Sequence, residues 1–234
     1  MIPFRDNISS RHYPIVTLVI ILANITIFLY QFSLTSEDLH NFLFRYGVVP
    51  AKLQLIGQNP VLVITGFGIS IIASMFLHGG LLHLSGNILY LWIFGDNIED
   101  RMGSIRFIFF YFLCGILGSG THVLFNLDNQ IPAIGASGAI SGVLGAYLLS
   151  YPFAKIRTII PLFLFWPIIE LPAILVLGSW FFIQLFNGTT SLNETSQVMN
   201  GVAWWAHIGG FIAGTVLIRL FSRYPIRHYH RKKF

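Results

Sequence analysis

Ser137 lies among small apolar residues that would leave its hydroxyl open to a substrate carbonyl. The stretch 134–142 reads IGASGAISG, and the apolar run continues to Leu149. A nucleophilic serine needs bare surroundings and nearby free backbone N–H groups for an oxyanion, which the first turn of a helix supplies. The alternative is a tight contact between membrane helices, because Ser137, Ser141 and Gly145 share one helix face. On this stretch alone, packing is the favoured interpretation.

A histidine on a glycine-rich helix face is the candidate partner of this serine. The stretch 203–214 reads AWWAHIGGFIAG, so His207, Gly210 and Gly214 lie on one face. Glycines at this spacing let a neighbouring helix approach closely, and if that helix carries Ser137, His207 can act as its general base. A lone membrane histidine more often stabilises a helix contact, but the glycine face and a shared depth favour catalysis. No acidic residue occupies an obvious third position, so the residues predict a Ser–His dyad.

Two further polar residues, His83 and Asn87, are four apart and project from one face of a predicted helix. Intramembrane polar groups are costly and serve either function or a hydrogen bond between helices. Taken singly, each residue fits both interpretations. Together they offer two donors at one level, as an oxyanion site requires. His78, nearer the membrane surface, is explained adequately by a helix cap or a loop contact.

The composition indicates a membrane protein. The chain has 234 residues, of which 55% are hydrophobic and 10% charged, whereas a soluble domain carries about 25% charged residues. The charges occupy short intervals between long apolar runs, as in polytopic helical membrane proteins. The net charge of +5 is explained by basic residues beside apolar spans, so we expect no nucleic-acid partner. A single cysteine and the lack of an H-E-x-x-H motif argue against a metal site, and we expect no cofactor.

The apolar runs predict an all-α fold of six transmembrane helices in one membrane domain, residues 1–234. The spans are expected at about 14–32, 71–94, 105–125, 135–151, 159–186 and 202–221.

Lys and Arg concentrate in the N-terminus (1–13), in two of the polar intervals and in a basic tail (223–234), so the positive-inside rule predicts that both termini are cytoplasmic. The segment 33–70 is then an outer loop with short amphipathic pieces. Ser137 and His207 therefore share a depth just below the outer surface.

The fifth predicted span contains three prolines, Pro161, Pro167 and Pro172, which would remove helix hydrogen bonds. We therefore expect it to be the element that moves to admit a transmembrane substrate, with the aromatic stretch 180–182 closing the gap beside it. Glu170 lies between these prolines as a candidate proton relay or a partner for freed backbone. A small transporter would also fit a broken span, but the two halves show no inverted repeat.

Together, the motifs resemble those of rhomboid intramembrane serine proteases of the bacterial six-span type. The matching residues are Gly135-Ala136-Ser137-Gly138, His207-x-x-Gly210-x-x-x-Gly214, His83-x-x-x-Asn87 and the turn Glu99-x-Arg101-x-Gly103. The resemblance implies Ser137 as nucleophile and His207 as general base, with an oxyanion hole formed by the Ser137 N–H, His83 and Asn87. It also implies cleavage of transmembrane protein substrates near the outer surface of a lipid bilayer, in a bacterial inner membrane, without a cofactor.

Two positions depart from the family pattern. Some members have a Trp-Arg pair in the loop after the first span, which is not seen before Phe76 here. Some have a tyrosine four residues after the serine, where this chain has Ser141. The competing interpretation is a non-catalytic rhomboid-like protein that binds membrane helices. Because such proteins typically lack the serine or the histidine, their joint presence favours the enzyme.

Overall fold

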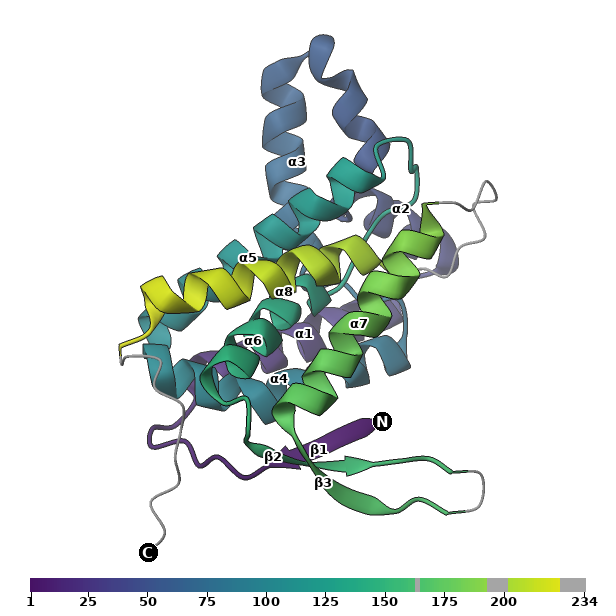
Figure 1. Ribbon diagram of the computed structural model, residues 1–234. Helices are drawn as coiled ribbons and strands as arrows, with labels where there is room; N and C mark the ends of the chain where they lie inside the picture. The colour runs from purple at the N-terminus through teal and green to yellow at the C-terminus, as the bar shows by residue number, and fades with distance from the viewer. Residues whose placement is uncertain (163–164, 193–201, 224–234) are drawn as a thin grey trace, which may run out of the picture.

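Helices make up most of the computed structural model, which describes residues 1–162, 165–192 and 202–223 (Figure 1). The α-helices are α1 (Ile15–Ser33), α2 (Ser36–Tyr46), α3 (Pro60–Ser74), α4 (Leu81–Met102), α5 (Ser104–Phe125), α6 (Ser137–Ser150), α7 (Ala173–Ser191) and α8 (Trp204–Phe221), and the 3-10 helix η1 spans Pro50–Gly57.

Four of the described helices, α1, α5, α7 and α8, are long and apolar enough to cross a membrane. This confirms the expected polytopic helical membrane protein. The count of six spans stays a prediction, because α6 has 14 residues and α4 ends in a charged segment.

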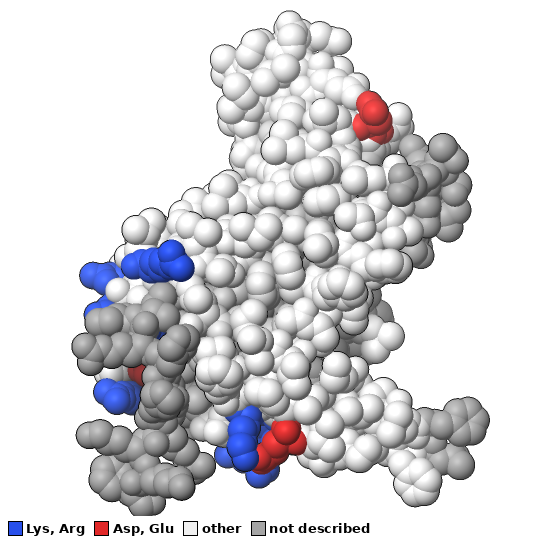
Figure 2. All heavy atoms as spheres, in the orientation of Figure 1, with Lys and Arg blue, Asp and Glu red and all other residues white. Residues whose placement is uncertain are grey.

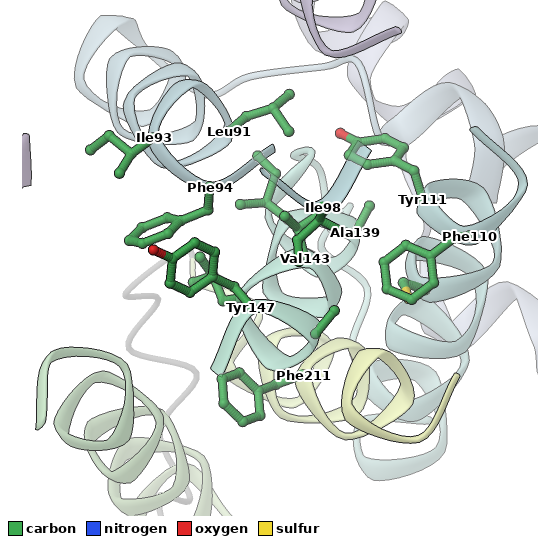
Figure 3. Close-up of a cluster of buried hydrophobic side chains, with 14 of the residues drawn as sticks. Leu91, Ile93, Phe94, Ile98, Phe110, Tyr111, Ala139, Val143, Tyr147 and Phe211 are labelled. Carbon is green, nitrogen blue, oxygen red and sulfur yellow. The ribbon is translucent and has the colours of Figure 1, made fainter. Parts of the chain in front are cut away.

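The helix α6 lies at the centre of the bundle and packs against α8, α5 and α4 (Figure 1). Large buried side chains converge there from four helices, namely Phe94, Tyr111, Tyr147 and Phe211 (Figure 3). The outer helices instead expose large apolar side chains, as lipid-facing surfaces do. Examples are Leu22, Phe109 and Phe182, which are 64%, 65% and 67% exposed.

Glycines bring the backbones of α6 and α8 into direct contact. A Cβ atom at Gly210 would overlap the carbonyl oxygen of Gly138, and one at Gly214 would overlap that of Gly142. The predicted close approach of these two helices is therefore confirmed. Because the contact is backbone against backbone, it fixes the depth of the first turn of α8 relative to the start of α6.

The predicted fifth span, 159–186, is wrong over its first half, because none of its described residues before Ala173 is helical. Residues Lys155–Ile159 (β2) and Ile168–Pro172 (β3) form an antiparallel hairpin, and β1 (Ile2–Asp6) pairs with β2 at the other edge. The helix α7 begins only at Ala173, so the three prolines precede it and break no helix. Both strands of the hairpin contain apolar β-branched residues, so by hydropathy alone this stretch resembles a membrane span.

Glu170 lies on this hairpin and not in a helix, so its predicted intramembrane setting is also wrong. Its carboxylate contacts Arg157 at 3.2 Å and Lys155 at 3.3 Å on an exposed face. Hydrogen bonds from these two cations hold the pKa of Glu170 below its usual value.

The predicted second span, 71–94, is interrupted. The helix α3 ends at Ser74 and α4 begins at Leu81, after the glycine pair 79–80, which favours a break because glycine loses most freedom in a helix. The helix α3 falls largely in the predicted outer loop and projects from the bundle (Figure 1). The helix α4 then continues to Met102 through the residues predicted as a charged turn.

Glu99 is buried near the end of α4 and caps α1. Its carboxylate accepts from the backbone N–H groups of Val16 and Thr17 at 3.0 and 2.8 Å and from the hydroxyl of Ser104 at 2.6 Å. A negative charge at a helix N-terminus is stabilised by these free donors and by the helix dipole. Glu99 of the turn motif therefore serves as a helix-capping carboxylate.

The N-terminal strand and the end of α8 lie at the same end of the molecule. Asn97 donates to Asp6, and the backbone N–H of Arg223 donates to the carbonyl of Arg101. Lys and Arg side chains gather at this end and beside the hairpin, whereas the visible belt above them is uncharged (Figure 2). Residues 224–234 of the predicted basic tail lie outside the described residues.

Candidate active site

Ser137 is the first residue of α6, directly after a turn that requires glycine. Gly135 has a φ of +126°, which side-chain-bearing residues rarely adopt, and its N–H donates to the carbonyl of Ser74 at 2.8 Å. Ala136 follows as the N-cap. The serine hydroxyl therefore sits at a helix N-terminus, where the first backbone N–H groups have no intrahelical partner.

His207 lies in the first turn of α8 and faces this hydroxyl. Its Nε2 atom is 2.8 Å from Ser137 Oγ, a hydrogen-bond distance. The side chain of His207 is buried, at 9% exposed. The structure thus brings together a hydroxyl and an imidazole that are 70 residues apart in the chain.

The other ring nitrogen of His207 contacts a residue that the sequence analysis did not select. Nδ1 is 2.8 Å from Oε1 of Gln184, which comes from α7 and is 5% exposed. Gln184 Nε2 donates to the carbonyl of Trp180 at 3.2 Å. The search for a third residue considered acids, and so missed an amide. An amide side chain inside an otherwise apolar helix was the available signal.

His83 lies beside the serine hydroxyl, from the first turn of α4. A Cβ atom placed at Gly135 would be 2.8 Å from the His83 ring and 3.5 Å from Ser137 Oγ, so both groups flank the same glycine. The N–H of Gly79 lies 3.4 Å from His83 Nδ1. The ring and the start of α6 therefore border one small space.

Asn87 is buried one turn further along α4. Its Nδ2 donates to the carbonyl of His83 at 2.9 Å, which uses one of the two N–H groups of the amide. The structure thus engages Asn87 within its own helix. Its second amide N–H is not used in this bond and is available to another acceptor on this face of α4.

The backbone of His78 makes a loop contact with α1. Its backbone N–H donates to Gln31 Oε1 at 3.0 Å, and Gln31 Nε2 donates to the carbonyl of His78 at 3.1 Å. This reciprocal pair joins the loop before α4 to α1. It holds the loop that leads into α4, the helix that carries His83, against α1.

A small, partly open pocket adjoins Ser137. Its walls include Met75, His122 and Ala206. Within the described part of the chain, no group of three or more His, Cys, Asp or Glu side chains could hold a metal ion.

Ser141 does not contact the histidine ring. Its hydroxyl donates to the carbonyl of Ser137 at 2.6 Å, within α6. Aromatic support for His207 comes instead from Trp180 and Trp204, whose ring centroids lie 5.9 and 6.2 Å from that of the imidazole. Two tryptophans therefore flank the imidazole ring.

Comparison with known proteins defines the class to which this bundle belongs. A family model described as a rhomboid domain matches residues 66–224, which include α4 to α8 and every residue of the candidate site. The chain belongs to the rhomboid family.

The relatives include proteins named as rhomboid proteases and one named as inactive. The chain is 40% identical over 92 residues to the mitochondrial rhomboid protein 1 of Saccharomyces cerevisiae, covering 38% of this chain and 27% of that protein. It is 33% identical over 144 residues to the putative rhomboid protease YdcA of Bacillus subtilis, covering 61% and 65%. It is 41% identical over 78 residues to the inactive RHOMBOID-like protein 8 of Arabidopsis thaliana, covering 33% and 22%. The chain thus spans less than two thirds of each of these relatives.

Proposed function

We propose that the chain is an intramembrane serine endopeptidase that cleaves transmembrane segments of other membrane proteins. Ser137 is the nucleophile, His207 is the general base, and the Ser137 N–H with His83 and Asn87 forms the oxyanion hole. The observation that carries the proposal is the 2.8 Å contact between Ser137 Oγ and His207 Nε2 at a helix N-terminus. Chance packing seldom places a buried imidazole on a serine beside free backbone donors.

In the reaction, Ser137 Oγ attacks the carbonyl carbon of the scissile peptide while its proton passes to His207 Nε2. The carbonyl oxygen becomes an oxyanion, which the donors at the start of α6 and on α4 stabilise. Collapse of this intermediate breaks the C–N bond, and the proton on His207 passes to the leaving amine. A water molecule then attacks the acyl-enzyme with His207 again as base, which releases the acid and restores the hydroxyl.

The setting of the site supports a transmembrane substrate. Serine and histidine both lie at helix starts, at the end of the bundle opposite the N-terminal strand and the end of α8. The positive-inside rule predicts that the end carrying the N-terminal strand and the end of α8 is cytoplasmic. The site at the opposite end is then near the outer surface of the membrane. Cleavage then needs a substrate whose helix can open there, because a helical peptide bond has its carbonyl engaged.

A non-catalytic protein that binds membrane helices is the second candidate. It is favoured by the identity of 41% over 78 residues to a relative named as inactive. Such a protein would bind a transmembrane segment without cutting it. Binding and cleavage measured on the same substrate separate the two functions.

The deciding experiment uses the purified chain in liposomes with a tagged single-span substrate. We expect wild type to cut the substrate, Ser137→Ala to bind it without cutting, and Ser141→Ala, a matched serine one turn further along α6, to cut it. Binding by wild type without cleavage would favour the second candidate. Cleavage by Ser137→Ala near the wild-type rate would exclude Ser137 as the nucleophile.

A further inference from the structure

We propose that Gln184 is a positioning residue for His207, whose side-chain oxygen holds the imidazole in the tautomer and orientation that lets Nε2 take the Ser137 proton. This inference rests on the proposed function. It adds a third member, from a different helix, to the predicted dyad.

The contacts of Gln184 fix which of its two amide atoms faces the histidine. Nε2 donates to the carbonyl of Trp180, which lies one turn earlier on α7. A flipped amide would set its oxygen against that carbonyl, two acceptors facing each other. Oε1 is therefore the atom that lies 2.8 Å from His207 Nδ1.

An acceptor at Nδ1 determines the chemistry at Nε2. Neutral imidazole carries its proton on one nitrogen, and a carbonyl oxygen cannot donate, so Nδ1 must hold the proton. Nε2 then presents a lone pair to the hydroxyl of Ser137. In soluble serine proteases a buried aspartate fulfils this role. An amide fixes the same tautomer without placing a charge in the membrane.

Other neighbours of His207 do not replace this oxygen. Trp180 and Trp204 flank the ring, but an indole N–H donates and cannot accept. Among the described side chains that contact the imidazole, Gln184 supplies the acceptor for Nδ1. Without it, the imidazole can adopt the other tautomer, in which Nε2 carries the proton and cannot take that of Ser137.

The test compares two reactions of the full chain in liposomes. One is cleavage of the tagged single-span substrate, from which kcat and KM are obtained. The other is the rate at which a small fluorophosphonate modifies Ser137, which reports the dyad without entry or unwinding of a transmembrane helix. The variants are Gln184→Met, which removes the acceptor at similar volume, and Gln184→Glu, which restores one. Ser179→Ala is the matched control, because the Ser179 hydroxyl donates a hydrogen bond to the carbonyl of Val176 within α7.

We expect Gln184→Met to lower both kcat and the modification rate by roughly 10²-fold, with KM unchanged. Gln184→Glu should recover most of the modification rate, and Ser179→Ala should match wild type. Gln184→Asn keeps an amide but withdraws its oxygen by one methylene group, so it should also react slowly. This last variant keeps the test decisive if Gln184→Met fails to fold.

Three outcomes would count against these statements, each in a different way. Unchanged modification rates in Gln184→Met and Gln184→Asn would overturn the inference and leave the proposed function intact. A lower kcat with an unchanged modification rate would place Gln184 in substrate entry and overturn its positioning role. A wild-type chain that neither cuts the substrate nor reacts at Ser137 would overturn the proposed function, and with it the inference.

Discussion

The helix α8 is held by two neighbours in opposite ways. Against α6 it presents glycines, and the two backbones touch at Gly210 and Gly214. Against α7 it presents aromatic rings, with Phe211 stacked on Phe181 at 4.5 Å between centroids. The first contact leaves no room for movement, whereas the second consists of side chains that can rearrange.

His207 lies between these two contacts and draws on both. Its backbone depth, and so its distance to Ser137, is set by the glycine contact with α6. Its Nδ1 atom contacts Oε1 of Gln184 on α7 at 2.8 Å. The distance between the Ser137 hydroxyl and the His207 imidazole is therefore set by a backbone contact, whereas the second ring nitrogen of His207 contacts a side chain of the helix that is packed less tightly.

The largest effect is expected at the two residues that the fixed contact aligns. Ser137→Ala and His207→Ala should each reduce cleavage roughly 10⁴-fold or more, while the protein stays folded. Because the two groups act as one unit, the double variant should be no slower than either single variant. Losses that multiply in the double variant would contradict a joint role. Rates in liposomes and thermal unfolding on the same samples provide the comparison.

The next effect compares a glycine in the backbone contact between α6 and α8 with a glycine of α7 that has open space beside it. Gly214→Ala forces a methyl group against the Gly142 carbonyl, so the helices must separate, at a cost of roughly 1–3 kcal/mol. We expect a lower Tm and slower cleavage. Gly178→Ala on α7 meets nothing within 4 Å and should leave Tm unchanged or raise it, since alanine favours helix. Equal Tm values for both variants would contradict the fixed contact.

A smaller effect is expected where α7 meets α8 through rings. Phe181→Ala removes the stacked pair and should speed cleavage of a transmembrane substrate several-fold, if movement of α7 admits the substrate. Phe182→Ala is the matched control, because this side chain faces lipid at 67% exposed. The fluorophosphonate rate should be the same in both variants and wild type. Slower cleavage in Phe181→Ala at an unchanged Tm would exclude α7 as the moving element.

The smallest effect concerns the far end of α6, where Tyr147 donates a hydrogen bond to Asp6. The pKa of Asp6 is raised to about 6, mainly because the carboxyl group is buried. The hydrogen bond from Tyr147 lowers this pKa, and the nearby charge of Asp96 raises it. The folded state thus binds this proton more tightly than the unfolded state does. The resulting stability is fully present below about pH 4 and is lost as pH rises through about 6.

Asp6→Asn imitates the protonated acid and should remove this pH dependence. We expect its Tm to exceed that of wild type by about 3 °C at pH 7 and the gap to narrow at pH 5. Thermal unfolding of both proteins at the two pH values measures it. A gap that widens on acidification would show that the ionised carboxylate stabilises the fold.

Sequence reasoning succeeded where periodicity and topology sufficed. The glycines of α8 and the small residues of α6 predicted their contact, and the basic residues predicted a common depth for Ser137 and His207. Both inferences need only the spacing along a helix and the number of crossings between them. A hydrogen bond of 2.8 Å between the two side chains is consistent with them.

It failed where the same composition fits two structures. The apolar residues of 155–172 suit a hairpin as well as a span, and the prolines, treated as helix breakers, in fact precede α7. The predicted second span includes the glycine pair 79–80, which in the structure directly precedes the start of α4. The sequence analysis does not select Gln184, because its contact with His207 depends on how α7 is rotated against α8, which hydropathy does not report.

The small sheet also imposes an order on assembly. The strand β1 pairs Arg5 with Arg157 on β2, so β1 is synthesised well before its partner, which follows α6. Such a long loop is slow to close. The sheet is therefore completed only after the first six α-helices have been synthesised, and its closure joins the start of the chain to the hairpin that leads into α7. During biogenesis, β1 is therefore synthesised early and paired late.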